Sequence, residues 1–172
     1  MTTIRHALMT GAMAIAAQAT LSAPAIARAA PDGARGQHSV TATTAEVNAL
    51  IQSHINSFNA RDAAKATSID APDFLGIFHG SANIVGPAQD LASTSAMVAD
   101  PALKLVIENQ HLDVSSAGDM ATWRSTYRFT YTDPATGKPR VELGNYLIGF
   151  ARQADGTMKA AWDVVSDTPP GP

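Results

Sequence analysis

The 172-residue sequence contains no cysteine. This absence excludes disulfide bonds, a thiol nucleophile, and any zinc or iron–sulfur site held by cysteine ligands.

The sequence also lacks the motifs of several other function classes. There is no run of lysine or arginine, so we expect neither nucleic-acid binding nor binding to anionic membranes. The spaced histidines of zinc proteases and the carboxylate loop of calcium sites are missing, so no metal site is expected. The serine-hydrolase elbow and the phosphate-binding loop are missing too. We therefore expect no cofactor.

The composition is that of a soluble globular protein. Apolar residues make up 45% of the chain and charged residues 16%, which is enough apolar material for one domain with a core. The length also suits a single domain.

The N-terminus resembles a secretory signal peptide over residues 1–29. Arg5 and His6 precede a short uncharged stretch, and Ala27-Arg28-Ala29 fits the small-x-small rule for cleavage. The stretch is short for a membrane span, although an uncleaved anchor is the alternative. Cleavage would leave 10 basic and 15 acidic residues, a net charge of −5. We expect a periplasmic or secreted protein that does not bind membranes after cleavage.

The rest of the chain divides into three parts. Residues 30–42 are rich in glycine and polar residues and predict a flexible lead. Residues 43–167 predict the folded domain. Residues 168–172 contain three prolines, which cannot continue a helix or a central strand, and predict a flexible tail.

The first part of the domain predicts about three helices. Thr43 and Glu46 have the spacing of a capping box, and an apolar stripe then repeats at helical spacing from Val47 to Phe58. Asp62 can cap a short second helix. A strand follows over residues 73–80, and Gly86-Pro87 starts a third helix that reaches about Val98.

The second part predicts four long antiparallel strands, over residues 103–115, 120–131, 141–152 and 158–166. Helices that precede a run of strands are typical of an α+β fold, here a curved antiparallel sheet covered on one face. The hollow between the sheet and the helices is a natural pocket for a small molecule.

Three stretches resemble a known family. They are Phe58-Asn59-Ala60-Arg61-Asp62, Gly118-Asp119-Met120-Ala121, and the segment from Gly144-Asn145-Tyr146-Leu147 to Trp162-Asp163. Their order resembles the nuclear transport factor 2-like superfamily, in particular its SnoaL-like and ketosteroid isomerase-like domains. The resemblance implies a cone-shaped fold that encloses a pocket, and commonly a homodimer. The superfamily contains both enzymes and proteins without catalysis, so it does not supply the function.

The resemblance also places candidate residues. The tyrosine donor of ketosteroid isomerases falls on His54, their carboxylate base on Phe78 or His79, and their second donor on Tyr146. These replacements do not support steroid isomerisation by that mechanism, but several of them can still move protons.

We take His54, His79, Tyr146 and Asp163 as candidate catalytic residues. For His54 the alternative is a hydrogen-bonded core histidine, since it lies in an apolar helix stripe. For His79 and Asp163 the alternative is an exposed position at a strand end or in a surface salt bridge.

We take Phe58, Phe78, Trp123 and Tyr127 as candidate ligand-binding residues. Trp123, Tyr127, Phe129 and Tyr131 alternate along one strand and share a face. That face is either a pocket wall or part of the sheet core or a dimer interface.

Three functions remain open. The first is a domain that binds a small apolar or aromatic molecule without turnover, in a cavity of at least about 300 Å³. The second is a lyase, isomerase or hydrolase in which His54 and a second polar group converge in the pocket. The third is a dimeric interaction module with an exposed aromatic sheet face.

Overall fold

The computed structural model describes residues 38–168, so the predicted signal peptide lies outside the described residues. The chain order begins with α1 (Val40–Asn59), α2 (Ala63–Ala66) and the 3₁₀ helix η1 (Thr67–Ile69). It continues with β1 (Asp70–Phe78), β2 (Ile84–Val85), α3 (Pro87–Val98), β3 (Lys104–Val114), β4 (Met120–Thr132), β5 (Pro139–Arg152) and β6 (Met158–Asp167).

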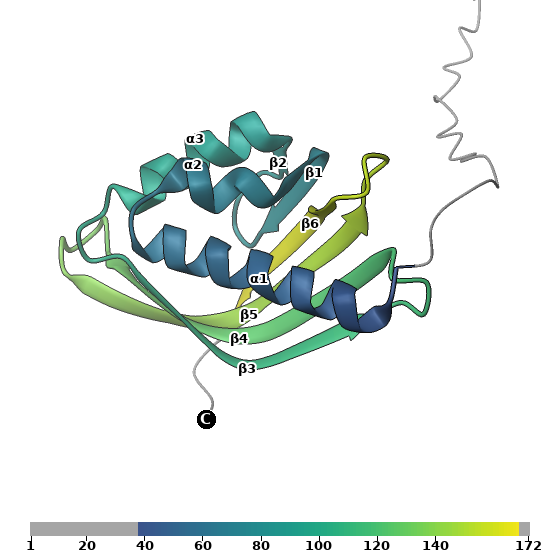
Figure 1. Ribbon diagram of the computed structural model, residues 1–172. Coiled ribbons are helices and arrows are strands. Elements are labelled where there is room, and N and C mark those ends of the chain that lie inside the picture. Colours follow the sequence, from purple (N-terminus) through teal and green to yellow (C-terminus); the bar gives the residue numbers. More distant parts are fainter. Residues whose placement is uncertain (1–37, 169–172) are drawn as a thin grey trace, which may run out of the picture. The chain divides into compact units, whose positions relative to one another are not determined.

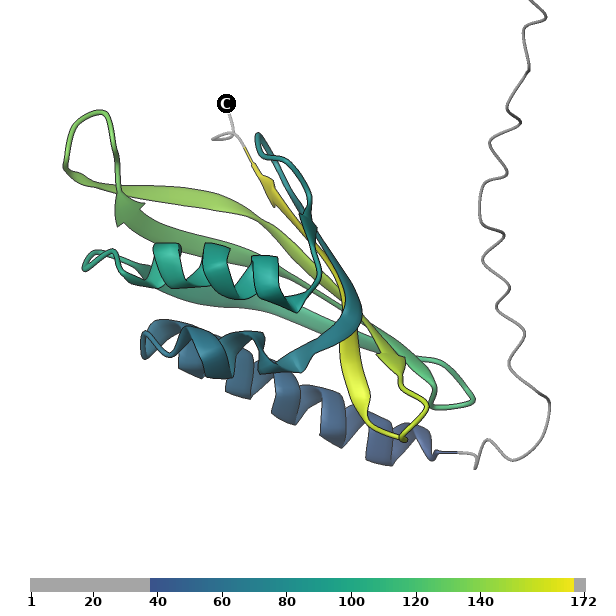
Figure 2. The ribbon, with the colours of Figure 1, turned by 90° about the horizontal axis from the view of Figure 1, so that it is seen from above.

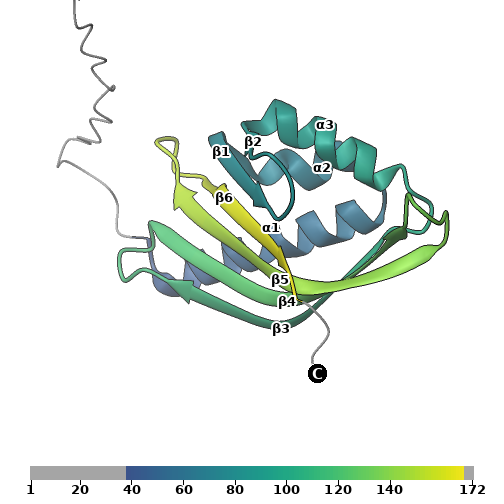
Figure 3. The same ribbon diagram turned by 180° about the vertical axis from the view of Figure 1, so that it is seen from behind.

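The six strands form one curved sheet in the order β2-β1-β6-β5-β4-β3. The helices lie on one side of this sheet, and the opposite side carries none of the described helices (Figures 1 and 3). Seen from above in Figure 2, α3 lies over the sheet. The predicted α+β fold with helices on one face of a curved sheet is therefore confirmed.

One strand pair departs from the predicted antiparallel sheet. Strand β1 lies between the short edge strand β2 and the last strand β6, and it pairs with β6 in parallel, with Gly76 opposite Asp163. The two strands are joined by most of the domain and not by a hairpin, so the connection does not impose an antiparallel direction. Their pairing brings Asp70 and Asp163 into one region of the sheet.

Helix α1 starts earlier than the capping box predicted. Ser39 is the cap, and its side chain accepts a hydrogen bond from the Ala42 N–H. Thr43 and Glu46 have another role, because both bind the largely buried Arg152: its Nη2 lies 2.9 Å from Thr43 Oγ1 and its Nη1 lies 2.9 Å from Glu46 Oε2. These side chains fasten the first turns of α1 to the end of β5.

The end of α1 explains one of the motifs that resemble the family. Arg61 has φ 69°, in the left-handed region, and it follows the last turn of the helix. Glycine adopts this conformation most easily, so an arginine at this position is unusual. Here the Arg61 guanidinium donates to the Pro101 carbonyl at 3.1 Å, which ties the turn to the start of β3. The next residue, Asp62, caps α2 as predicted, by accepting from the Lys65 N–H.

The predicted period-2 pattern of β4 is confirmed. Trp123 and Tyr127 are buried on the face toward the helices, while Arg124 and Arg128 are exposed on the other. The buried face packs against Val47 of α1 and closes the core. Among residues 38–168, no helix is both long enough and apolar enough to cross a bilayer.

Candidate functional site

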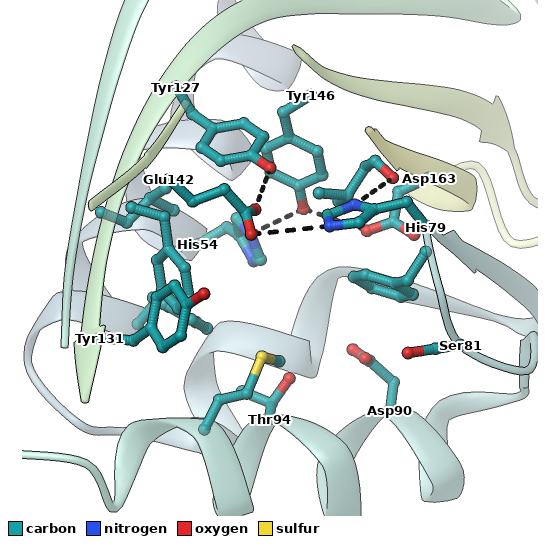
Figure 4. A pocket seen from close by; sticks show the side chains of 16 residues that line it. His54, His79, Ser81, Asp90, Thr94, Tyr127, Tyr131, Glu142, Tyr146 and Asp163 are labelled. Atoms are coloured by element: carbon teal, nitrogen blue, oxygen red, sulfur yellow. Dashed lines mark hydrogen bonds and ion pairs between the residues drawn. The ribbon is translucent and has the colours of Figure 1, made fainter. Parts of the chain in front are cut away.

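A pocket of about 270 Å³ lies between the helices and the concave face of the sheet (Figure 4). It is slightly smaller than the 300 Å³ we expected of a ligand cavity. The polar lining comes from α1, the end of β1, α3 and the central strands, and aromatic side chains form much of the rest. The lining residues are His54, Phe58, Phe78, His79, Ser81, Asp90, Thr94, Met97, Leu105, Tyr127, Phe129, Tyr131, Glu142, Tyr146, Asp163 and Val165.

His54 lies on the pocket-facing side of α1, and both of its ring nitrogens have a partner. Nδ1 is 3.0 Å from the Ala66 carbonyl oxygen, and Nε2 is 3.1 Å from the Tyr146 hydroxyl. A carbonyl only accepts, so Nδ1 carries the hydrogen, and in neutral histidine Nε2 is then an acceptor. Burial lowers the pKa of His54, which favours this neutral form.

Tyr146 of β5 joins His54 to Asp163 of β6. Its hydroxyl lies 3.2 Å from Asp163 Oδ2, and Asp163 Oδ1 has no hydrogen-bond partner among the described residues. Burial, and secondarily the charge of Asp90, raise the pKa of Asp163 to about 7, whereas the bond from Tyr146 and the Ile77 backbone N–H lower it. Burial also raises the pKa of Tyr146 well above its usual value, so the phenol stays protonated.

These three groups have two proton arrangements. With Asp163 protonated, its hydroxyl donates to Tyr146, and Tyr146 donates to Nε2 of His54, so each donor meets an acceptor. When Asp163 loses its proton, the Tyr146 hydroxyl turns to the carboxylate and leaves Nε2 without a donor. One proton of this hydrogen-bonded group can therefore be transferred, and the direction in which the Tyr146 hydroxyl donates depends on whether Asp163 holds it.

A pair of carboxyl groups, from Asp90 and Asp70, lies beside Asp163, Tyr146 and His54. The sequence analysis did not predict this pair. Asp90 is buried in the first turn of α3 and lines the pocket, and it shares a hydrogen bond with the buried Asp70 of β1. Burial first, and then Asp90, raise the pKa of Asp70 to about 8. Burial also raises the pKa of Asp90, against the bonds from Asp70 and Thr94. A shared proton is the arrangement that lets two such carboxyls lie together.

A third cluster occupies a more exposed part of the pocket. Glu142 of β5 accepts a hydrogen bond of 2.6 Å from the Tyr127 hydroxyl, and its other oxygen lies 3.6 Å from Nε2 of His79. Burial, and secondarily Glu142, raise the pKa of Tyr127. The side chains of His79 and Glu142 are 36% and 23% exposed, so solvent reaches this cluster.

The structure brings most of the predicted residues together. All four candidate catalytic residues line this one pocket, as do Phe58, Phe78 and Tyr127. Trp123 does not line it, because Trp123 packs edge-on against the far side of Tyr146, with ring centroids 5.6 Å apart, and is 1% exposed. Its predicted place in the pocket wall is therefore corrected to the core.

The aromatic face of β4 points toward the helices. Phe129 and Tyr131 continue this face, and both line the pocket. The interaction-module hypothesis required this face to be exposed, and it is largely covered. No group of three or more acidic or histidine side chains among the described residues is placed to hold a metal ion.

No protein-family model and no curated protein matches the sequence. Solved structures do match the fold. The hexachlorocyclohexane dehydrochlorinase LinA-type3 of Novosphingobium barchaimii superposes with a TM-score of 0.66 at 17% identity, over 74% of this chain and 88% of that one. A ketosteroid isomerase-like protein of Erwinia carotovora gives 0.60 at 20% identity, over 73% and 96%.

A third matching structure identifies the fold. It is a nuclear transport factor 2-like protein of Novosphingobium aromaticivorans, with a TM-score of 0.62 at 18% identity, over 76% of this chain and 85% of that one. The fold is the nuclear transport factor 2-like cone. The identities are too low to show more than this fold, so the activity must be argued from the pocket.

Proposed function

We propose that the protein binds a small, largely apolar molecule in this pocket and catalyses proton transfer on it, as lyases and isomerases do. One observation carries the proposal: the hydrogen-bonded residues Asp163, Tyr146 and His54 line one cavity, whose other walls combine aromatic rings with polar side chains. A carboxyl group with a pKa of about 7 can both take and give a proton near neutral pH.

Each residue has a distinct role in this reaction. The Asp163 carboxylate removes a proton from a carbon atom of the substrate. The electron pair left on carbon either moves into an adjacent double bond, in an isomerisation, or expels a leaving group from the next carbon, in an elimination. Asp163 then returns the proton to another carbon or to the leaving group. Tyr146 and His54 are positioning residues, because they act through Asp163.

The named neighbours are compatible with this class of reaction. One is a hexachlorocyclohexane dehydrochlorinase, and another is described as ketosteroid isomerase-like. Both names concern reactions at carbon in small apolar molecules.

We also propose that the protein is exported to the periplasm or secreted, from the signal pattern of residues 1–29. A homodimer remains a proposal as well. The outer face of the sheet offers exposed apolar side chains for it, including Leu143 at 43% and Ile77 at 38% exposure.

Binding without turnover is the second candidate function. With Asp163 protonated, the hydroxyl groups of Asp163 and Tyr146 and the Nδ1–H of His54 each meet an acceptor, so no donor of this group needs a reacting substrate. In that case the carboxyl group orients a ligand and no proton moves.

Deuterium incorporation separates the two functions even before any product is identified. The protein is incubated in deuterium oxide with alicyclic ketones, β-hydroxy ketones and chlorinated cyclohexanes, and the compounds are examined by mass spectrometry. We expect exchange or elimination for at least one class, with a rate that rises through about pH 7 as Asp163 ionises.

Asp163→Asn should reduce this rate by roughly 10²–10⁴-fold, the usual contribution of a positioned acid–base group. Asp113→Asn is the matched control, since the Asp113 side chain is 68% exposed on the outer face of the sheet. Compounds that bind without any exchange would replace catalysis with the binding function. Equal rates in the two variants would contradict the role of Asp163.

A further inference from the structure

Apart from tyrosines, the ionisable side chains that line the pocket are acidic groups and histidines. Three carboxyl groups face it, from Asp90, Glu142 and Asp163, together with His54 and His79. None of the lining residues is a lysine or an arginine. A carboxylate ligand would therefore enter a cavity that offers like charges and no cationic partner.

Two of these acids, Asp163 and Asp90, are deeply buried. Asp163 is 6% exposed, and its Oδ1 has no hydrogen-bond partner among residues 38–168. Buried polar atoms in folded proteins are nearly always hydrogen-bonded. Oδ1 faces β1, where a Cβ atom on Gly76 would lie 3.2 Å from it, so a molecule in the cavity meets the charge of the Asp163 carboxyl group and not this enclosed oxygen.

The opposite side of the pocket is aromatic. Phe58, Phe129 and Tyr131 follow one another along it, with ring centroids 6.3 Å apart for the first pair and 5.5 Å for the second. In Figure 4, Tyr131 lies across the cavity from Asp163 and Asp90. Aromatic faces attract organic cations and pack well against apolar rings.

We infer that the pocket selects molecules in which an apolar ring carries a protonated amine, and that it rejects the corresponding carboxylates. The ammonium group lies in the field of the Asp163 and Asp90 carboxyl groups, while the ring lies against Phe58 and Phe129. This inference rests on the proposed function, because it narrows the ligands of the same pocket.

Binding of a protonated amine should also be linked to the release of protons from the protein. A bound ammonium group favours the ionised form of each carboxyl beside it, so the protein releases protons when the amine binds. Affinity for the amine should then rise between pH 6 and pH 8, the range in which Asp163 titrates. A neutral ligand of the same shape has no such dependence.

The test uses three probes that share one ring and differ in charge: naphthalen-2-ylmethylamine, naphthalen-2-ylmethanol and naphthalene-2-carboxylate. Their dissociation constants are measured by calorimetry at pH 6, 7 and 8, in two buffers with different ionisation enthalpies. At pH 8 we expect the amine to bind at least about tenfold more tightly than the alcohol, which is about 1.4 kcal/mol. The carboxylate should bind most weakly, and proton release should accompany the amine alone.

Asp163→Asn should bring the amine close to the alcohol and remove the pH dependence, while the alcohol still binds and so reports a folded pocket. Asp113→Asn removes the same charge from the outer face and should change neither result. Amine and alcohol within twofold at pH 8, or a carboxylate that binds as tightly as the amine, would overturn the charge preference but leave the pocket. If none of the three binds, both this inference and the proposed ligand class are wrong.

Discussion

The substitution Asp163→Asn tests the buried acid through the stability of the protein. The pKa of Asp163 is raised from an ordinary value of 3.8 to about 7, and that of Asp70 to about 8. At pH 6.5 the unfolded chain has already ionised both groups, whereas the folded chain still holds most of Asp70's proton and part of Asp163's, and it releases them as the pH rises to 8.5. The folded state therefore loses its advantage as the pH rises through these values.

The size of the loss follows from the two pKa values. From pH 6.5 to 8.5, a carboxyl group with a pKa of about 7 accounts for about 0.8 kcal/mol, and one with a pKa of about 8 for about 2 kcal/mol. His54 has a lowered pKa and acts with the opposite sign below pH 6.5, so this window leaves its contribution small. The wild-type protein should lose about 3 kcal/mol across the window, and Asp163→Asn about 2 kcal/mol.

Urea unfolding at closely spaced pH values measures both slopes. The variant should also be the more stable protein at pH 8.5, by a few degrees in Tm, because it no longer buries a charge there. Asp70→Asn should remove the larger share of the dependence, centred near pH 8. Parallel curves for the wild type and Asp163→Asn would show that Asp163 is already ionised at pH 6.5, and the reasoning would fail.

Three further predictions concern the supports of the pocket. Arg152→Met should cost about 2–4 kcal/mol in urea unfolding, because the buried guanidinium binds Thr43, Gly118 and Glu46, whereas Arg124→Met on the exposed face should cost less than about 0.5 kcal/mol. Gly144→Ala would bring its methyl group against the Ser166 carbonyl of β6 and to 2.5 Å from the Tyr127 hydroxyl, so we expect β5 to shift and the Tyr127 ring to move. The loss of the bond to Glu142 should appear as a lowered Tyr127 pKa in an ultraviolet titration, and an unchanged titration would contradict this. Tyr146→Phe should raise the pKa of Asp163 above 7, because the bond from the phenol favours the carboxylate, and a carbon-13 titration that moved downward would be inconsistent with the chain.

Much of the fold was predictable because its signals are local. The apolar stripe of α1 and the alternation of β4 each follow from residues close together in the sequence, and the structure has both. The start of α1 was misplaced because Thr43 and Glu46 have the spacing of a capping box. Their side chains instead form hydrogen bonds with Arg152, which is more than 100 residues away in the sequence.

The site was only partly predictable, because some of its contacts join residues that are far apart in the sequence. His54, Tyr146 and Asp163 were found because the family resemblance or strand alternation singled them out. Asp90 and Asp70 have no such signal: each looks like an ordinary cap or loop residue, and their pairing depends on β1 running parallel to β6 beside α3. Trp123 and Tyr127 share a face of β4, but Tyr146 packs against Trp123. Tyr127 therefore lines the pocket, whereas Trp123 lies in the core beneath Tyr146.

The protonation state of Asp163 tests the proposed proton transfer most directly. Carbon-13 NMR of the aspartate carboxyls, assigned with Asp163→Asn, gives its titration, and nitrogen-15 shifts of His54 give the tautomer in the same samples. We predict a midpoint near pH 7 for Asp163, with His54 neutral and protonated on Nδ1 throughout. A midpoint near pH 4, or a His54 that holds a proton on Nε2 at pH 7, would contradict the proton-transfer site.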